Sequence, residues 1–421
     1  MHTLKGVIFS LSDVLAHKGS IDPDLFFETV KLLKFLISKE IQPVLVSNTP
    51  WIVNIKDGEK KPFQDYLSEF VGEKLPYYQG GKDIDYKQRS SAMRAILDQH
   101  GWSAPEVFYV GNTQEDVLAA SNGGFPLLNA KWHGDNSPYG FEFASPKEIA
   151  SFVDCCCITP KNWFWGIEIG KLRVYSIAPF AEYSRAYPQG AIYSTDAKQA
   201  VKQDTGNIRF WGLLMAARIH LSGIGTETNF VAPYPGHKTS SKKTKLMNAI
   251  AVVSGSLRAR YLFDFIERHS DAEKSQTLRT TGGSPSSQNQ LSTIKLNATP
   301  TRTGPQQLKY VNKPNLKGRT VLVVDDICTE GYSLEASRAF FEAAGANVIL
   351  LSWLKTPGRN DYHAIEKITP AIKRPFSKFS PTSVREAIYS NSGNVLNRNA
   401  DTEIAEAYEK YVSWDWPTTL S

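Results

Sequence analysis

Residues 321–333 read VLVVDDICTEGYS, and this stretch decides the fold of the second half of the chain. Four apolar residues lead into Asp325 and Asp326, which is typical of a buried parallel strand with polar groups at its carboxyl end. A turn containing Gly331 follows, and the spacing of residues 333–344 predicts a helix. The free N–H groups that open such a helix can hold a phosphate. The two carboxylates can reach ribose hydroxyls, either directly or through a cation.

Further predicted strands lie on both sides of this stretch. Residues 230–232 and 347–353 are apolar runs of strand length, so the pattern indicates an α/β unit. Between them lies a long polar segment, residues 270–307. Its most polar part, residues 280–290, is rich in Ser, Thr, Gly and Gln and is expected to form a mobile loop.

The first 150 residues show the same alternation of strands and helices. Strands are predicted at residues 7–9, 43–46 and 107–110, and helices at residues 24–39, 90–99 and 116–120. The predicted fold class is therefore α/β, with two doubly wound parallel-sheet domains. We expect a first domain over residues 1–153, a linker over 154–165, a second domain over 166–375 and a helical, basic C-terminal extension over 376–421.

The amino-acid composition excludes several classes of protein. Hydrophobic residues make up 41% and charged residues 21%, which excludes collagen, a coiled coil and wholesale disorder. No run of eighteen apolar residues occurs, so neither a membrane-spanning helix nor a secretory leader is expected. The four cysteines, three of them contiguous at residues 155–157, fit a reducing compartment. The expected location is cytoplasmic, without a membrane partner.

Charge is distributed unevenly along the chain. Residues 1–150 contain 15 basic and 19 acidic residues, a net charge of −4, whereas the remainder carries +10. A basic second part suits phosphates, pyrophosphate or nucleic acid. Near the C-terminus, basic residues alternate with Phe376 and Phe379, a pattern that could bind a nucleic acid or a protein, or could simply be a solvated face. The basic residues are Lys367, Lys373, Arg374, Lys378 and Arg385. A homo-oligomer or a multi-protein complex is expected.

Residues 7–15, VIFSLSDVL, resemble the first motif of the haloacid dehalogenase-like (HAD) hydrolases, in which a strand ends in DxDG(T/V)L. In that family the first aspartate is the nucleophile and a Mg²⁺ ligand, and the second is the general acid. This chain has Ser10 and Ser12 at those two positions. The resemblance therefore implies a HAD-like domain whose catalytic carboxylates are missing.

Three later features extend this resemblance. Residues 44–48 resemble the second motif, in which the hydroxyl of Ser47 would grip phosphate. Lys87 has nearly the spacing of the family lysine. Residues 109–116 resemble the metal motif, with Asn112 in place of its first acid and Asp116 retained.

The chemistry of that family requires an ionised nucleophile and several carboxylates around Mg²⁺. Serine cannot replace the nucleophile without a general base, and Asp116 together with Asp13 supplies few oxygen ligands. We expect a degenerate, catalytically dead HAD module that serves as a scaffold. An altered hydrolase that uses Asp13 remains the alternative, and an active phosphatase is the least favoured hypothesis.

Residues 321–333 resemble the signature of the type I phosphoribosyltransferases (PRTases). The resemblance implies that Asp325 and Asp326 bind the ribose hydroxyls and Mg²⁺ and act in catalysis. It also implies that the following loop wraps the 5′-phosphate of phosphoribosyl diphosphate (PRPP). The loop residues are Thr329, Glu330, Gly331, Tyr332 and Ser333. Glu330 departs from the family, which has a small residue there, and a carboxylate so close to a phosphate would repel it.

Other positions are assigned by their order along the chain. Residues 230–238 resemble the pyrophosphate loop of the family. Arg279, in the polar segment, would belong to a catalytic lid, and Trp353 could stack on a base or pack in the core. The substrate-binding residues implied in the pyrophosphate loop are Pro235, Gly236, His237 and Lys238.

Together the two resemblances imply a HAD–PRTase fusion similar to proteins of bacterial stress-response or phage-defence loci. The expected activity is that of a phosphoribosyltransferase-type glycosyltransferase of nucleotide metabolism. It would bind PRPP or a nucleotide with Mg²⁺ and transfer or remove a ribose-phosphate group. The alternative is a non-catalytic sensor or regulator with the transferase fold, which binds a nucleotide or nucleic acid.

Overall fold

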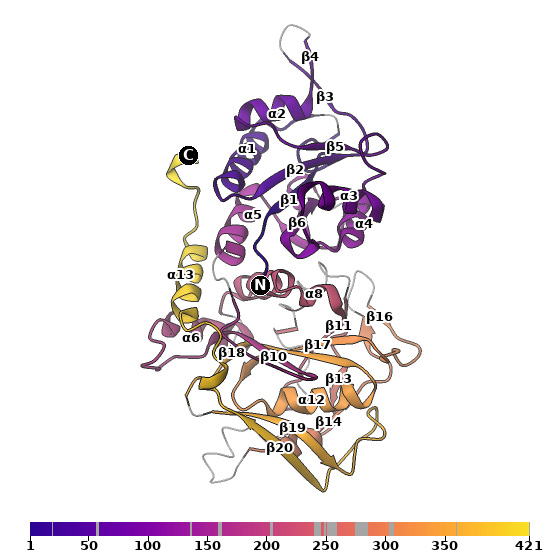
Figure 1. Cartoon of the computed structure of the whole chain (residues 1–421), viewed down its shortest axis with the longest axis vertical. Helices are drawn as coiled ribbons and strands as arrows, with labels where there is room; N and C mark the ends of the chain where they lie inside the picture. Colours follow the sequence, from indigo (N-terminus) through magenta and orange to yellow (C-terminus); the bar gives the residue numbers. More distant parts are fainter. Residues whose placement is uncertain are drawn as a thin grey trace.

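The computed structural model describes residues 1–421 except 19, 56–58, 135–136, 159–161, 203–204, 240–245, 248–249, 251–258, 274–284, 303–306, 359 and 421. Two sheets of six strands organise the chain, one in each half (Figure 1). The chain is thus a mixed α/β protein. Among the described residues, no helix is both long enough and apolar enough to cross a membrane.

The first sheet is wholly parallel. Its order is β5 (Tyr77–Gln79), β2 (Gln42–Ser47), β1 (Gly6–Ser10), β6 (Val107–Gly111), β7 (Leu127–Ala130) and β8 (Phe141–Phe143). The helices of this half are α1 (Pro23–Ser38), α2 (Phe63–Val71), α3 (Ser90–His100), α4 (Gln114–Gly123) and α5 (Pro146–Phe152). A hairpin of β3 (Ile52–Asn54) and β4 (Lys60–Pro62) extends from it. The chain winds outward from β1 in one direction and from β6 in the other, so the switch point lies between these two strands.

Local sequence explains why α1 forms where it does. Asp22 caps the helix by accepting hydrogen bonds from the N–H groups of Asp24 and Leu25, and Pro23 stands at the first helical position. Helical spacing then places Phe26, Val30 and further apolar residues on one buried face. The helix packs this face against the core of the first half.

The second sheet is mixed. Its order is β12 (Arg260–Tyr261), β11 (Thr228–Pro233), β17 (Thr320–Cys328), β18 (Asn347–Lys355), β10 (Leu172–Pro179) and β9 (Trp165–Ile169). β9 runs antiparallel to β10, so the expectation of a second purely parallel sheet is wrong at this edge. The short turn at Gly170 forces this reversal, because a parallel connection needs a much longer crossover. The switch point of this sheet lies between β11 and β17.

Helices and small sheets surround this second sheet. The helices are α6 (Gly190–Lys202), α7 (Ile208–Leu221), α8 (Ile224–Glu227), α11 (Ser287–Leu291), α12 (Tyr332–Ala343) and α13 (Ala400–Val412). The two-stranded sheets are β13 (Ile266–Arg268) with β14 (Ile294–Leu296), β15 (Thr301–Arg302) with β16 (Leu308–Lys309), and β19 (Tyr362–Thr369) with β20 (Ser383–Tyr389).

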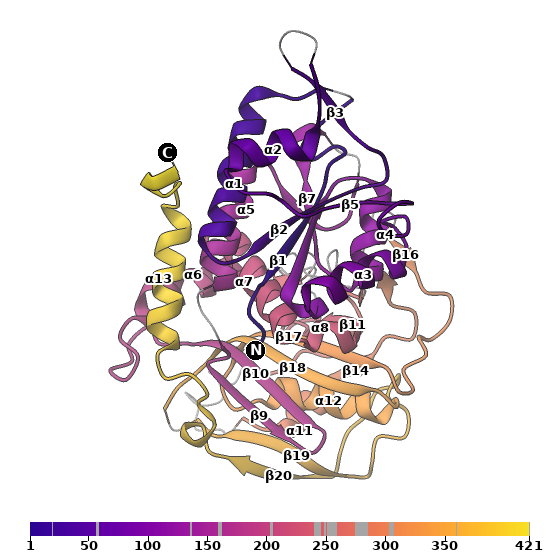
Figure 2. The ribbon, with the colours of Figure 1, turned by 45° about the horizontal axis from the view of Figure 1, so that its top comes forward.

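Helix α7 lies between the two sheets (Figure 2). Every residue from Phe210 to Leu221 is buried, so the helix is covered on all sides, as its nearly continuous apolar sequence requires. Its C-terminal turn contacts the first half directly: His220 Nε2 lies 2.9 Å from the carbonyl oxygen of Val107, and the N–H of His2 donates to Leu221 O at 2.7 Å. One hydrophobic cluster consequently runs through both halves.

The strands and helices predicted from sequence are confirmed, with shifts at their ends. The largest shift is in β17, which continues past the acidic pair to Cys328 because β18 pairs with it that far. One prediction needs correction. Residues 287–290 belong to α11, with Ser287 and Gln290 buried, and do not form part of a loose loop. Phe376 and Phe379 are partly buried and pack against the second core.

Candidate functional sites

The switch point of the first sheet brings together three predicted residues. Lys87 Nζ donates to Asp116 Oδ1 at 2.8 Å and to Ser10 Oγ at 3.0 Å. All three side chains are buried. Ser10 ends β1, and Asp116 lies in the first turn of α4, so the parallel sheet places them at one edge.

Asp116 has hydrogen-bond partners on both of its oxygens. Tyr109 also donates to Oδ1, at 2.9 Å, while Oδ2 accepts from the N–H of Asn112 and from both the N–H and the hydroxyl of Thr113. Burial alone would raise the pKa of Asp116, but Lys87 and these hydrogen bonds outweigh it and lower the pKa. The carboxylate is therefore ionised and fully engaged.

The remaining predicted residues do not complete a metal site. Asp13 Oδ1 lies 2.7 Å from His17 Nδ1, Ser47 donates to Thr49 O at 2.8 Å, and the side-chain amide of Asn112 donates to Gly134 O at 3.0 Å. Ser12 is half-buried, and its carbonyl oxygen lies 3.5 Å from Ser10 Oγ. Nowhere in the described part of the chain do three His, Cys, Asp or Glu residues gather as metal ligands.

The switch point of the second sheet lies beside Asp325 and Asp326. Pairing between β11 and β17 ends at Pro233 and Val324, and the N–H of Tyr234 then donates to Val324 O at 2.8 Å. From Asp325 onward, β17 pairs only with β18 on its other side. The acidic pair therefore borders the opening between the carboxyl ends of β11 and β17.

The carboxyl groups of Asp325 and Asp326 are neighbours that repel each other when both are ionised. Burial, followed by the neighbouring Asp326, raises the pKa of Asp325 well above its usual range, and Arg268 only partly offsets this. The N–H of Asp326 donates to Asp325 Oδ1 at 2.9 Å, and the N–H of Ile327 donates to Asp326 Oδ1 at 2.8 Å. Two adjacent carboxyl groups fit a Mg²⁺ ion that takes its other ligands from water and substrate phosphate.

The loop that follows β17 is held from behind. Lys355 Nζ donates to Thr329 O at 2.6 Å, and the N–H of His363 donates to Glu330 O at 2.9 Å. Gly331 has a φ of +87°, and a Cβ atom there would lie 2.2 Å from the ring of Tyr362. The carbonyl groups of the loop thus face β18 and β19. The first N–H groups of α12 have no helical partners, as at any helix start.

Lys355 also interacts electrostatically with Glu330. Its side chain is fully buried and lies over the ring of Trp165, 5.3 Å from the ring centre. Burial lowers the pKa of Lys355, while Cys328, Glu330 and Asp361 counteract that shift. A positive charge under the loop therefore partly compensates the carboxylate that departs from the family pattern.

The turn that follows β11 is anchored by Arg268. The Arg268 side chain donates to Gly236 O through Nε, and to the hydroxyl of Tyr234 at 3.1 Å through Nη2. The N–H of Ala272 donates to His237 O at 2.9 Å. These contacts hold the turn's carbonyl groups toward residues 268–272, while Lys238 is exposed to solvent.

Trp353 is not available at this site. Trp353 is buried, stacks on Trp211 with ring centres 5.7 Å apart, and donates through Nε1 to Met215 Sδ at 3.3 Å, so it cannot stack on a base. Its place in β18 points it into the core that contains α7. Arg279 lies outside the described residues.

Sequence reasoning assigned no role to Arg268, Lys355 or Tyr362. Lys355 did carry a signal, since it is a charged residue at the end of the long apolar strand that follows the acidic motif. Arg268 likewise ends a short strand that contains Ile266. Their contacts depend on which strands become neighbours, and a single sequence does not state this.

No family model and no curated protein matches the chain. Several solved structures are similar to part of it. The deoxy-D-mannose-octulosonate 8-phosphate phosphatase of Haemophilus influenzae, in its cobalt-bound form, is 18% identical over 30% of this chain and 69% of that chain, with a TM-score of 0.22. A HAD-superfamily hydrolase of Geobacter sulfurreducens is 12% identical over 35% of this chain and 95% of that chain, with a TM-score of 0.24.

A third similar structure is the 3-deoxy-D-manno-octulosonate 8-phosphate phosphatase of Moraxella catarrhalis, in complex with magnesium, phosphate and KDO. It is 10% identical over 36% of this chain and 85% of that chain, with a TM-score of 0.24. The similarity to HAD-superfamily hydrolases thus extends over part of the chain, about a third of its length.

Proposed function

We propose that the second half of the protein binds a 5-phosphorylated ribose, with PRPP as the first candidate, at the carboxyl edge between β11 and β17. The observation that carries this proposal is the arrangement around the switch point. A half-buried acidic pair lies beside a loop whose carbonyl groups are turned away by Lys355 and His363. Main-chain N–H groups at a helix start can hold a phosphate, and the acidic pair suits a cation or ribose hydroxyls.

Different residues would bind different parts of the ligand. Residues 329–333 would hold the 5-phosphate, and Asp325 with Asp326 would hold Mg²⁺ and the ribose hydroxyls. The anchored turn at residues 235–238, with the exposed Lys238, would receive the diphosphate. Mg²⁺ bound there would supply charge stabilisation of the departing pyrophosphate.

The reaction proposed is displacement at ribose C1. The bond from C1 to the pyrophosphate oxygen breaks, and a nitrogen of the acceptor forms the new bond to C1, losing a proton to solvent. Such a step depends on positioning and electrostatic stabilisation, and it needs no protein nucleophile. The chain's own contribution is to orient the ribose and to compensate the charge of the leaving group.

We propose that the HAD-like half is catalytically silent and acts as a scaffold. Asp116 is saturated with hydrogen bonds, and Lys87 lies between it and Ser10, where the family chemistry would need a free carboxylate. The shared hydrophobic cluster around α7 supports a structural role. We further propose that the protein acts in the cytoplasm, in a stress-response or phage-defence role.

Calorimetry with PRPP and Mg²⁺ tests the binding step. We expect binding to the full-length protein and a loss of at least tenfold in affinity for Asp326→Asn. Glu366→Gln, an exposed acid on β19, is the matched control and should bind as the parent does. Equal binding by Asp326→Asn would contradict the proposed site.

Release of pyrophosphate with a panel of bases separates an enzyme from a regulator. Turnover with any base supports the transferase, whereas binding without turnover supports the second candidate, a non-catalytic sensor with the same pocket. The half-buried Glu330 in the phosphate loop favours that second candidate.

A further inference from the structure

A pocket lies at the opposite edge of the second sheet, away from the acidic pair. Its cavity of about 280 Å³ is formed at the amino ends of β11, β12 and β17 and by the connection that leads into β17. The lining residues are Asn229, Phe230, Arg260, Tyr310, Pro314, Asn315 and Arg319. Arg319 precedes Asp325 by six residues of extended strand, so the two sites are about 20 Å apart.

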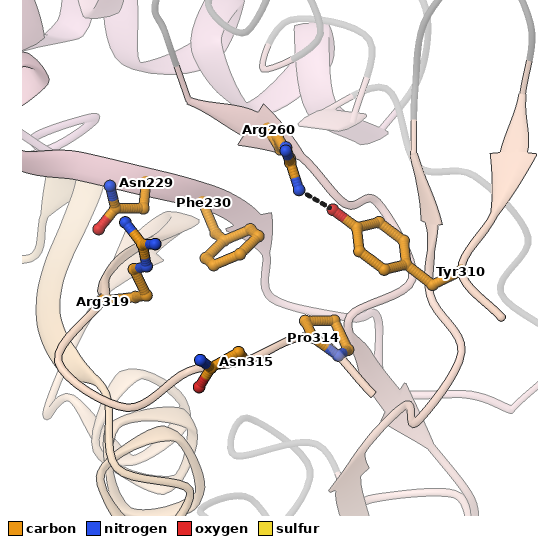
Figure 3. Close-up of a pocket in the computed structure, with 7 residues that line it drawn as sticks. All are labelled: Asn229, Phe230, Arg260, Tyr310, Pro314, Asn315 and Arg319. Atoms are coloured by element: carbon orange, nitrogen blue, oxygen red, sulfur yellow. Dashed lines mark hydrogen bonds between the residues drawn. The ribbon is translucent and has the colours of Figure 1, made fainter. Parts of the chain in front are cut away.

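The pocket combines aromatic and cationic side chains. Figure 3 shows Phe230 in its middle, with Arg319 and Asn229 on one side and Arg260 and Tyr310 on the other. Phe230 is 6% exposed and forms an apolar floor. Arg260 Nη1 donates to the hydroxyl of Tyr310 at 3.0 Å, which fixes the tyrosine ring at the rim.

The charge of the pocket is positive and uncompensated. No carboxylate is among its lining residues, and within the described ranges neither Arg260 nor Arg319 forms an ion pair. The nearby Glu227, which precedes β11, is engaged by Arg173 at 2.7 Å. Two exposed guanidinium groups in one cavity are suited to a phosphate, which they can bind through paired N–H donors.

Other features of the pocket further restrict the class of ligand that it can bind. Asn229 Oδ1 accepts from the N–H of Thr320 at 2.9 Å, so its NH₂ group remains a potential donor to a ligand. Asn315 is exposed at the same cavity. The volume is at the small end of ligand pockets, which favours a single nucleotide over a polymer. The tyrosine ring is a stacking surface for a base.

We infer that this pocket binds a 5′-nucleoside monophosphate, with the phosphate between Arg260 and Arg319 and the base on the ring of Tyr310. The site is independent of the proposed ribose-phosphate site. It stands on its own lining residues, and it would remain if the carboxyl edge bound nothing.

Calorimetry on the full-length protein with AMP, adenosine and inorganic phosphate tests the inference. We expect AMP to bind at least tenfold more tightly than either fragment. Arg260→Gln and Arg319→Gln should each weaken AMP binding at least tenfold. Lys317→Gln removes an exposed positive charge close by that does not line the pocket, and it should change the affinity by less than twofold.

Two results would overturn the site. One is equal weakening by Lys317→Gln and the arginine variants, which would indicate general charge attraction. The other is inorganic phosphate that binds as tightly as AMP, which would show that no contact with the base contributes to affinity. Because both arginines are exposed, the variants should keep the melting temperature of the parent, and a melt checks this.

Photolabelling with 8-azido-AMP locates the bound nucleotide. Label on the peptide that contains Tyr310 supports the pocket. Label confined to the peptide that contains residues 325–333 would place the nucleotide at the carboxyl edge and overturn the inference. This readout also separates the two proposals, since the outcome for Tyr310 does not depend on whether PRPP binds.

Discussion

Lys87 and Asp116 form a buried ion pair at the switch point of the first sheet, with Nζ and Oδ1 2.8 Å apart and side chains 2% and 0% exposed. Both charged groups are withdrawn from solvent at the carboxyl edge of this sheet. Each partner compensates the other, so the pair is a structural feature whose loss has a cost.

Replacing Lys87 with Met should destabilise the protein by about 3–5 kcal/mol at pH 7, because a buried carboxylate loses its partner. The pKa of Asp116 is lowered in the folded parent, so its contribution is present at neutral pH and is lost as pH falls through that pKa. Lys87→Met should therefore differ most from the parent at neutral pH and least in acid. Urea unfolding at several pH values measures this.

Lys5→Met provides the control for that prediction. Lys5 pairs with Glu106 at 2.7 Å but is 48% exposed, so its loss should cost no more than about 1 kcal/mol. Equal losses in the two variants would contradict the importance of burial at Lys87.

Gly331→Ala should disturb the loop at residues 329–333. Two effects add: a positive φ of 87°, which costs roughly 1–2 kcal/mol for a residue with a side chain, and a Cβ contact of 2.2 Å with Tyr362. Gly318 also has a positive φ, 68°, but open space around it, so Gly318→Ala should show the first effect alone. A thermal melt of both variants separates the effect of the backbone conformation from the effect of the contact with Tyr362. Equal shifts in melting temperature would show that the Tyr362 ring moves aside without loss of stability.

Asp325→Asn should make stability less dependent on pH. The raised pKa of Asp325 means that the folded state holds its proton more tightly than the unfolded state. That stabilisation is complete below the unfolded pKa and is lost as pH rises through the folded pKa, at about 1.4 kcal/mol per pKa unit. Without ligand, the variant should therefore match or exceed the parent's stability at neutral pH. Chemical unfolding from pH 4 to pH 8 measures the slope, and an unchanged slope would be evidence against the raised pKa.

Lys355→Met should impair both stability and binding. It removes donors to Thr329 O and Asn360 O, at 2.6 and 2.8 Å, and an unpaired buried carbonyl costs about 1–3 kcal/mol. Because the loop loses its support, PRPP affinity should fall at least tenfold. Lys309→Met, an exposed position, should alter neither quantity. Calorimetry and a thermal melt on the same samples measure PRPP affinity and stability. Unchanged PRPP affinity in Lys355→Met would show that Lys355 does not support the loop for binding.

Arg218→Met should stabilise the protein. Arg218 is buried in α7, donates to Met1 Sδ at 3.0 Å, and leaves Nε and Nη2 without partners among the described residues. Burial lowers its pKa to about 10. Replacing a poorly compensated buried charge with an apolar side chain gains about 1–4 kcal/mol in comparable cases. Denaturant unfolding at pH 7 tests this, with the exposed Arg209→Met as control, and a clear loss of stability would refute it.

Sequence periodicity was sufficient for the strands and helices that build the two switch points. The apolar run before Asp325 predicted β17, the spacing after Gly331 predicted α12, and the apolar run before Ser10 predicted β1. These features can be predicted locally, from apolar spacing, turn residues and side-chain chemistry.

Only the tertiary structure decided which groups meet. Lys355 lies under Thr329 because β17 and β18 pair in one particular register, Arg268 supports a turn more than thirty residues before it, and Trp353 enters the core because α7 covers it. Arg260 and Arg319, which line the pocket, lie in β12 and directly before β17, and the sheet brings these two segments near each other. Such contacts depend on strand order and burial, which arise from packing the whole chain and from no single stretch of it.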